Sequence, residues 1–181
     1  MADYILTYSK IKFYPLEPVK TDINIVDIAH SLSLMTRANG HFKHFYSVAQ
    51  HSVNCCKEAA NRGCSTRIQL GCLLHDASES YISDLTRPVK KNLPEYFLIE
   101  EKLQKIIFEW FGIGDLSDDE KEQINEIDDA LLYSEFKELM NMEIVDMVPV
   151  KSAELDFSQR EFLSVEQEFI SNFKRLAGTG Y

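Results

Sequence analysis

Several features that would place this chain in a special class are missing from its sequence. Only 7 glycines and 5 prolines occur among 181 residues, which excludes collagen-like and low-complexity chains. No apolar run approaches the roughly 20 residues that a membrane-spanning helix needs, and residues 1–10 lack the basic and apolar regions of a signal peptide. We therefore expect an ordinary globular protein that has no membrane partner.

Cysteine and positive charge are also scarce. The four cysteines, Cys55, Cys56, Cys64 and Cys72, form no CxxC pair, so we expect reduced thiols in a cytoplasmic protein. Acidic residues outnumber basic ones 29 to 19, and the net charge is −10. A surface of that sign repels phosphate backbones, so we expect no nucleic-acid polymer as a partner. An anionic substrate would need a local positive centre, such as a metal ion or an arginine.

The pattern of apolar residues predicts one all-α domain with a small β element at its N-terminus. Residues 4–16 have the partial alternation of short strands or an extended arm. Helices are expected at residues 25–36, 47–61, 66–80, 95–111, 117–141 and 159–177. We divide the single domain, residues 1–181, into an N-terminal arm (1–20), a helical core (21–145) and a C-terminal helix (146–181).

The helix predicted after Thr66 carries the first group of ionisable residues. With about 100° per residue, His75, Asp76 and Glu79 fall on the side opposite the apolar residues. An exposed helix face would carry varied solvating charges. A histidine beside two acids, directly after the apolar run GCLL, indicates a half-buried polar site instead.

The helix predicted from Ser117 carries a second signal. Asp128 lies near the centre of its apolar stripe, whereas Asp129 is turned toward the edge. A buried carboxylate without a partner costs several kcal/mol unless it is paired or bound to a cation. Its own helix offers Asp128 no partner, so we expect one from elsewhere in the fold.

His51, in the first turns of another predicted helix, completes a possible metal site. A single inward histidine is more often a core residue, and a single buried aspartate more often pairs helices. The ordered set of His51, then His75 and Asp76, then Asp128 comes from three predicted helices. Its nitrogen and oxygen donors suit one divalent ion such as Mn, Co, Ni or Zn, with Mg also possible.

This H…HD…D set resembles the HD-domain metal-dependent phosphohydrolase superfamily. The segments QHS around His51, LLHDASESYISDLTRPVK from Leu73 and INEIDDAL from Ile124 are similar to the bacterial 5′-deoxynucleotidase branch. The earlier segment DIAHSLSLMTRANGHFKHFYSVAQHS is more similar to phage and bacterial hydrolases of about this length, including the phage dATP triphosphohydrolase type. The resemblance covers roughly residues 20 to 140. It implies an HD-domain bundle of about six helices.

The resemblance also implies roles for residues of this chain. The implied metal ligands are His51, His75, Asp76 and Asp128. Glu79 matches the acid of the HDASE stretch and Asp84 the acid of the loop that follows, so both would assist catalysis.

Substrate contacts are expected from the segment before His51. Arg37 matches the arginine that the nucleotidases keep for the phosphate. In that branch a tryptophan comes next and shapes the sugar pocket, whereas this chain has Ala38. His41 and Lys43 are further candidates for the phosphate side of the cleft, with ordinary loop exposure as the alternative.

Three functions remain open at this point. The first is hydrolysis of deoxynucleoside 5′-monophosphates to nucleoside and phosphate. The second is a dNTP triphosphohydrolase that releases triphosphate. The third is a nucleotide or metal sensor without activity, against which the retention of Glu79 and Asp84 argues. The expected partner is a nucleotide, and the resemblance implies a homodimer or a larger homo-oligomer.

Overall fold

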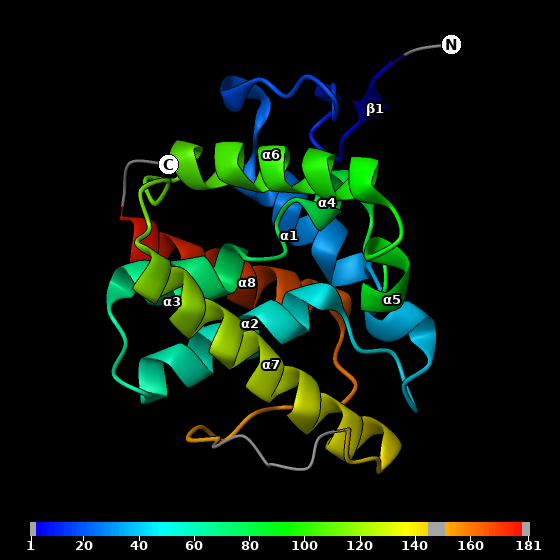
Figure 1. Cartoon of the computed structure of the whole chain (residues 1–181), viewed down its shortest axis with the longest axis vertical. Coiled ribbons are helices and arrows are strands. Elements are labelled where there is room, and N and C mark those ends of the chain that lie inside the picture. Colours follow the sequence, from blue (N-terminus) through cyan, green and yellow to red (C-terminus); the bar gives the residue numbers. More distant parts are fainter. Residues whose placement is uncertain (1–2, 145–150, 179–181) are drawn as a thin grey trace.

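The computed structural model describes residues 3–144 and 151–178, which form a helical fold with one short β-hairpin (Figure 1). In the hairpin, β1 (Ile5–Leu6) pairs antiparallel with β2 (Lys12–Phe13). The helices are α1 (Ile25–Leu34), α2 (Val48–Asn61), α3 (Thr66–Leu74), α4 (Glu79–Ile82), α5 (Arg87–Lys90), α6 (Pro94–Trp110), α7 (Asp118–Met140) and α8 (Phe162–Ala177), with 3₁₀ turns at Lys20–Asp22 and Arg37–Gly40. None of the described helices combines the length and the hydropathy that crossing a bilayer requires. The predicted all-α class with a small N-terminal β element is confirmed.

Local capping signals determine where several helices begin. The side chain of Asn24 accepts a hydrogen bond from the first turn of α1, and Ser47 does the same for α2. At the start of α7, Ser117 and Glu120 make both hydrogen bonds of a capping box. Each such cap stabilises its helix by about 0.5–2 kcal/mol. These helices therefore begin where the sequence predicts them.

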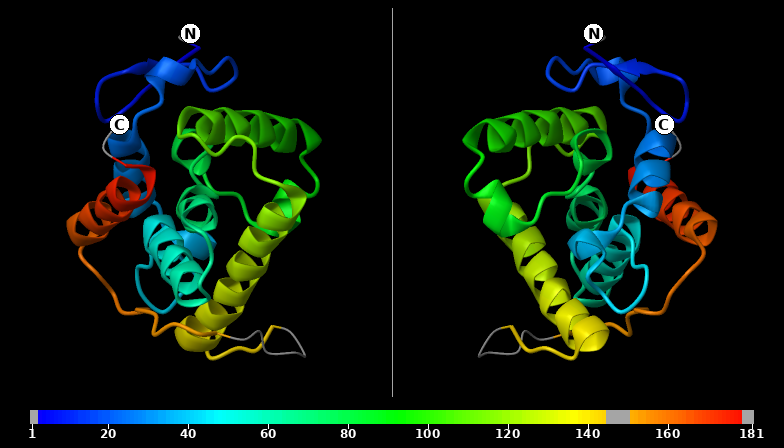
Figure 2. Two further views of the ribbon diagram at one scale, coloured as in Figure 1. Left: turned by 90° about the vertical axis from the view of Figure 1, so that its left-hand side faces the viewer. Right: turned by 90° about the vertical axis from the view of Figure 1, so that its right-hand side faces the viewer.

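Helices α2 and α3 lie in the middle of the molecule. They contact each other, and both contact α7 on one side and α8 on the other (Figure 2). The core between them includes the fully buried Leu73, Leu131 and Phe169, each of which stabilises the fold by about 1.5–3 kcal/mol. Where α3 meets α7, a Cβ atom at Gly71 would overlap Cδ1 of Ile124. The glycine thus allows the close approach of the two helices that later form the site.

The segment predicted as one helix over 66–80 is two helices with a turn between them. Helix α3 ends at Leu74 and α4 begins at Glu79. In a continuous helix the Ser78 N–H would donate to the Leu74 carbonyl. Here the side chain of Gln104, on α6, accepts from that N–H at 3.0 Å and donates to that carbonyl at 2.7 Å. The prediction of one continuous helix is therefore wrong. The turn between α3 and α4 contains His75 and Asp76, the predicted His-Asp pair.

Residues 151–158 lie against α2 before α8 begins, and Glu58 holds them there. The Glu58 side chain is fully buried. Its carboxylate accepts hydrogen bonds from Arg62 Nε at 2.8 Å, from Ser152 N at 2.9 Å and from Ala153 N at 2.8 Å. Burial alone would raise the pKa of Glu58, but these hydrogen bonds hold it below its ordinary value.

Acid should remove the contribution of Glu58 to stability. Because the folded-state pKa is lowered, this contribution is present above the unfolded-state pKa of about 4.5 and is lost as the pH falls through the folded-state pKa. We expect Glu58→Gln to lower the free energy of unfolding by about 1–3 kcal/mol at neutral pH, and this difference to shrink in acid. Urea unfolding from neutral pH to about pH 3 measures it, with the exposed Glu101→Gln as control. A difference that does not change with pH would contradict the assignment.

Candidate metal centre

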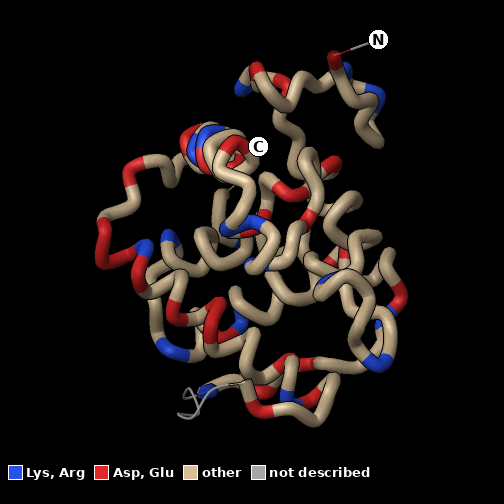
Figure 3. Tube along the Cα trace, turned by 45° about the vertical axis from the view of Figure 1, so that its right-hand side comes forward, with Lys and Arg blue, Asp and Glu red and all other residues tan. Residues whose placement is uncertain are grey.

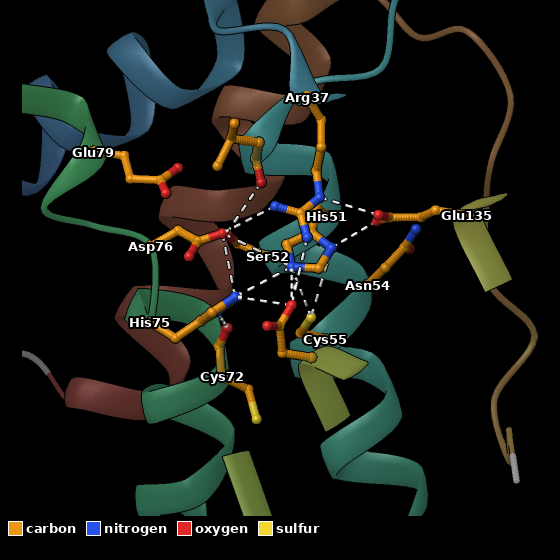
Figure 4. A network of polar contacts seen from close by, with 12 residues as sticks. Arg37, His51, Ser52, Asn54, Cys55, Cys72, His75, Asp76, Glu79 and Glu135 are labelled. Atoms are coloured by element: carbon orange, nitrogen blue, oxygen red, sulfur yellow. Dashed lines mark hydrogen bonds and ion pairs between the residues drawn. The ribbon is translucent and has the colours of Figure 1, made fainter. Parts of the chain in front are cut away.

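Four side chains meet where α2, the end of α3 and α7 come together (Figure 4). His51, His75, Asp76 and Asp128 are named the central cluster. The Nε2 atoms of His51 and His75 lie 3.1 Å apart. Asp128 Oδ1 lies 3.1 Å from the Nε2 atom of His51, and Asp76 Oδ2 lies 3.2 Å from that of His75. The structure thus brings together the four residues that the resemblance implies as metal ligands.

The protons of both imidazoles point away from the centre of the cluster. His75 Nδ1 lies 2.8 Å from the Cys72 carbonyl oxygen, and His51 Nδ1 lies 2.6 Å from Glu135 Oε1. These Nδ1 contacts are shorter than the 3.1 and 3.2 Å that separate the two Nε2 atoms from Asp128 and Asp76, so each neutral ring carries its proton on Nδ1 and presents the Nε2 lone pair. Ligand atoms that are about 2.1 Å from one tetrahedral ion lie about 3.4 Å from each other. The spacing and the donor atoms of the central cluster therefore fit a divalent metal ion.

The carboxylates of the cluster stabilise positive charge. Burial alone would lower the pKa of His75, but Asp76 and Asp128 raise it well above its ordinary value. Burial alone would raise the pKa of Asp128, but hydrogen bonds and positive charge from His51 and His75 in their protonated forms hold it well below its ordinary range. The cluster therefore favours a cation at its centre, and protons compete with a metal ion for the same atoms.

Cys55 adds a sulfur atom beside the cluster, one turn after His51 on α2. Its Sγ lies 3.4 Å from His51 Nε2. The possible ligand atoms of His51, Cys55, His75 and Asp128 all lie within 4.8 Å of one another. Burial, together with the charge of Asp128, raises the pKa of the thiol well above its ordinary value. Cys55 therefore stays a neutral thiol unless a metal ion displaces its proton.

A pocket of about 340 Å³ opens beside the central cluster. Asp76 and Asp128 of the cluster form part of its wall. The other lining residues are Arg37, Ala38, Phe42, Glu79, Asp84, Leu85, Thr86, Arg87, Pro88, Lys90, Leu132, Phe136 and Ile144. The wall thus includes both charged and apolar side chains. Such a pocket suits a small ligand that has ionic and apolar groups.

The pocket carries its own positive charges. Acidic and basic residues are interspersed along the described chain (Figure 3), so an anionic ligand depends on the charges of its site. Arg37 Nη1 lies 3.3 Å from Asp76 Oδ2, and its Nη2 lies 3.4 Å from Asp128 Oδ1. Lys90 Nζ lies 2.9 Å from Glu79 Oε1. Both cations are therefore held by carboxylates that line the pocket.

Glu79 and Asp84 face the pocket with raised pKa values. Burial is the main cause for both side chains, and the charge of Asp76 adds to it. Oε2 of Glu79 is buried and has no hydrogen-bond partner among the described residues. A carboxyl group whose pKa lies above its ordinary value can hold and release a proton nearer to neutral pH. Both residues therefore have the properties of a general acid or base.

His41 and Lys43 do not reach this pocket, contrary to the expectation that they line the phosphate side of the cleft. They line a separate depression, where Lys43 Nζ donates to the Glu138 carbonyl at 2.8 Å. Ala38 and Asn39 have φ angles of 52° and 50°, so the chain turns left-handed directly after Arg37. Beyond this turn Phe42 lines the pocket, whereas His41 and Lys43 on either side of it do not.

Glu135 belongs to the site although none of the motifs includes it. The side chain is fully buried on α7. Besides its contact with His51, its Oε2 accepts a hydrogen bond from Arg37 Nε at 3.0 Å. A signal for it exists in the sequence. Residue 135 follows Asp128 by seven positions, which is about two helical turns, so both side chains lie on one face of α7.

Fold and cluster together define a helical domain that contains a group of possible metal ligands. The family model described as HD domain matches residues 31–161. That match covers most of the chain, so the chain belongs to the HD domain family. HD domains are in general metal-dependent phosphohydrolases, and this one contains a group of possible metal ligands.

Two relatives are each similar to part of the chain. The chain is 42% identical over 110 residues to the uncharacterized protein YfdR of Escherichia coli strain K12, which is 61% of this chain and 59% of that protein. It is 38% identical over 103 residues to an uncharacterized protein of Rhodobacter capsulatus, which is 54% of this chain and 53% of that protein. The matched region thus spans less than two thirds of either relative.

Proposed function

We propose that this protein is a divalent-metal-dependent nucleotide phosphohydrolase that converts deoxynucleoside 5′-monophosphates to nucleoside and phosphate. One observation carries the proposal. The central cluster lies beside a pocket whose wall includes both cations and the apolar side chains of Phe42, Leu132 and Phe136. A nucleotide has the matching chemistry, because its phosphate is anionic and its base is flat and largely apolar. The similarity of the HDASE stretch and the loop after it to the 5′-deoxynucleotidase branch supports the same substrate class.

The central cluster and four charged residues of the pocket have roles in this proposal. A divalent ion held by the central cluster would neutralise phosphate charge and lower the pKa of a water molecule. Arg37 donates hydrogen bonds to the phosphate oxygens through its two Nη groups. Glu79 orients the attacking water and accepts its proton, and Lys90 holds Glu79 in place. Asp84 lies in the same wall and protonates the leaving oxygen of the sugar.

The charges around the pocket favour a monophosphate over a triphosphate. Arg87 already contacts Asp128 and Asp129, and Lys90 contacts Glu79 and Glu100. These cations are therefore largely neutralised by carboxylates before a substrate binds. A triphosphate carries more negative charge than a monophosphate, and the positive charge that remains around the pocket is too small to neutralise it. The dNTP triphosphohydrolase reaction remains the alternative, which the similarity to the phage enzymes supports.

A hydrolysis screen tests the proposal. All dNMPs, NMPs, dNTPs and NTPs are incubated with Mn²⁺, Co²⁺ or Mg²⁺, and the products are resolved as phosphate, pyrophosphate or tripolyphosphate. Phosphate from dNMPs is the expected result. Tripolyphosphate from dNTPs would replace the proposal with the alternative reaction. No product from any nucleotide, with metal demonstrably bound, would contradict the proposal and favour the sensor. Light scattering of the same sample tests the predicted homo-oligomer.

A further inference from the structure

We infer that Glu135 is a positioning residue that links metal binding to phosphate binding, through His51 on one side and Arg37 on the other. The phosphate part of this inference rests on the proposed function. The metal part does not, because it can be measured without a nucleotide.

The geometry places one carboxylate between two functional groups. Glu135 Oε1 lies 2.6 Å from His51 Nδ1, and its Oε2 lies 3.0 Å from Arg37 Nε. In Figure 4, Glu135 lies on the opposite side of the His51 ring from His75 and Asp76. The Glu135 side chain is fully buried, so water does not compete for either contact.

The first contact selects the form of His51 that can bind a metal ion. Asp128 Oδ1 also faces this ring, 3.1 Å from Nε2, but the Glu135 contact at Nδ1 is shorter, at 2.6 Å, so a neutral His51 carries its proton on Nδ1. Its Nε2 then presents a lone pair to the cluster, where the Nε2 atom of His75 is 3.1 Å away. The other tautomer would point an N–H at the metal position and would leave the carboxylate facing a lone pair. Partners of this kind fix the orientation of metal-binding histidines and strengthen metal affinity.

The second contact uses Nε of Arg37 and leaves its two Nη groups available for a phosphate. Glu135 takes the Nε–H of the guanidinium at 3.0 Å, and the two Nη groups point toward the cluster with longer contacts of 3.3 and 3.4 Å. Two parallel N–H groups are what a phosphate binds in a bidentate manner. The longer contacts are therefore the ones that a phosphate can replace, while the shorter contact keeps Arg37 in place.

The position of Glu135 in the helix explains how one element serves both purposes. Asp128 and Glu135 are about two turns apart on the same face of α7. Helix α7 thus provides a cluster residue directly and, two turns later, the group that orients another cluster residue. A shift of α7 would disturb both at once, so metal and phosphate binding depend on the placement of one helix.

Glu135→Gln is the decisive variant. In the amide an NH₂ group replaces one of the two accepting oxygens, so His51 Nδ1–H and Arg37 Nε–H no longer each face an acceptor. We expect the affinity for Mn²⁺, measured by titration calorimetry without nucleotide, to fall about 10–100-fold. Glu166→Gln is the matched control, because Glu166 makes the same kind of contact with His30 Nδ1, at 3.0 Å, outside the cluster. The control should bind Mn²⁺ like the parent protein.

Nitrogen NMR of the histidine rings supplies a readout that a merely structural role would not change. In metal-free parent protein, in alkaline buffer where the rings are neutral, His51 should carry its proton on Nδ1. A folded Glu135→Gln variant should shift that proton to Nε2. The parent spectrum alone overturns the inference if His51 carries its proton on Nε2, even if the variant does not fold. Parental Mn²⁺ affinity in the folded variant overturns it as well.

The two proposals fail in different ways. If the metal and tautomer measurements agree with expectation but no nucleotide is hydrolysed, the proposed function is wrong and the role of Glu135 toward His51 stands. If dNMPs are hydrolysed by both Glu135→Gln and the parent with the same kcat, KM and Mn²⁺ dependence, the proposed function stands and the positioning role is wrong.

Discussion

Asp128→Ala should abolish measurable Mn²⁺ binding and lower dNMP hydrolysis by about 10³-fold or more, the loss expected for several kcal/mol of metal-ion stabilisation. The variant removes Oδ1, which lies 3.1 Å from His51 Nε2 at the cluster. It also leaves the imidazoles without one of the two carboxylates that stabilise positive charge. Calorimetric titration with Mn²⁺ and a steady-state assay of phosphate release measure the two effects.

Asp129→Ala is the matched control for that experiment. Its side chain is 62% exposed and pairs with Arg87 at 2.8 Å, outside the cluster. We expect metal affinity and activity to stay within about threefold of the parent, because exposed ion pairs contribute about 0–1 kcal/mol. Equal losses of metal affinity and activity in the two variants would contradict the assignment of Asp128, rather than Asp129, to the face of α7 that forms the site.

Arg37→Lys should lower kcat/KM for dNMPs by about 10²-fold or more and change Mn²⁺ affinity much less. The lysine keeps the charge but loses the planar fork that donates to a carboxylate and a phosphate together. Arg37 is also buried among Asp76, Asp128 and Glu135, with 12% of its side chain exposed. A single ammonium cannot satisfy all three. Phosphate-release kinetics over a range of substrate concentrations, with Mn²⁺ titration of the same sample, separate the two effects.

Arg87→Lys provides the comparison at the rim of the pocket. Arg87 is 55% exposed and pairs with Asp128 and Asp129, so its replacement should cost less than about tenfold in kcat/KM. If Arg37→Lys behaves no worse than Arg87→Lys, then Arg37 serves only to neutralise buried carboxylates and does not bind the phosphate.

Local signals made much of the fold predictable. The caps of α1, α2 and α7 depend on residues within one turn of each helix start, and these starts agree with the structure. The interruption between α3 and α4 could not be predicted in the same way. It depends on Gln104, whose amide replaces a helical hydrogen bond from a distance of 26 residues to Ser78 and 30 residues to Leu74. That contact can be recognised only in the folded structure, where α6 packs beside the turn.

The candidate site was predictable where helical phase decides the answer. The inward Asp128 and the exposed Asp129 follow from the apolar stripe of α7. The same stripe also points to Glu135, which a search for family motifs passes over. His41 and Lys43 line a different depression from the one expected, and the left-handed turn that precedes them leaves little trace in the sequence, since alanine rarely adopts such a conformation.

That left-handed turn restricts how the pocket can evolve. Ala38 belongs to the pocket wall and has a φ angle of 52°, a conformation that strains most residues by about 1–3 kcal/mol and β-branched ones most. Phe42 and Phe136 line the same pocket without a positive φ angle. Changes of substrate size should therefore be tolerated at the two phenylalanines, whereas the tryptophan that the nucleotidases have at the position of Ala38 would require a different backbone conformation here.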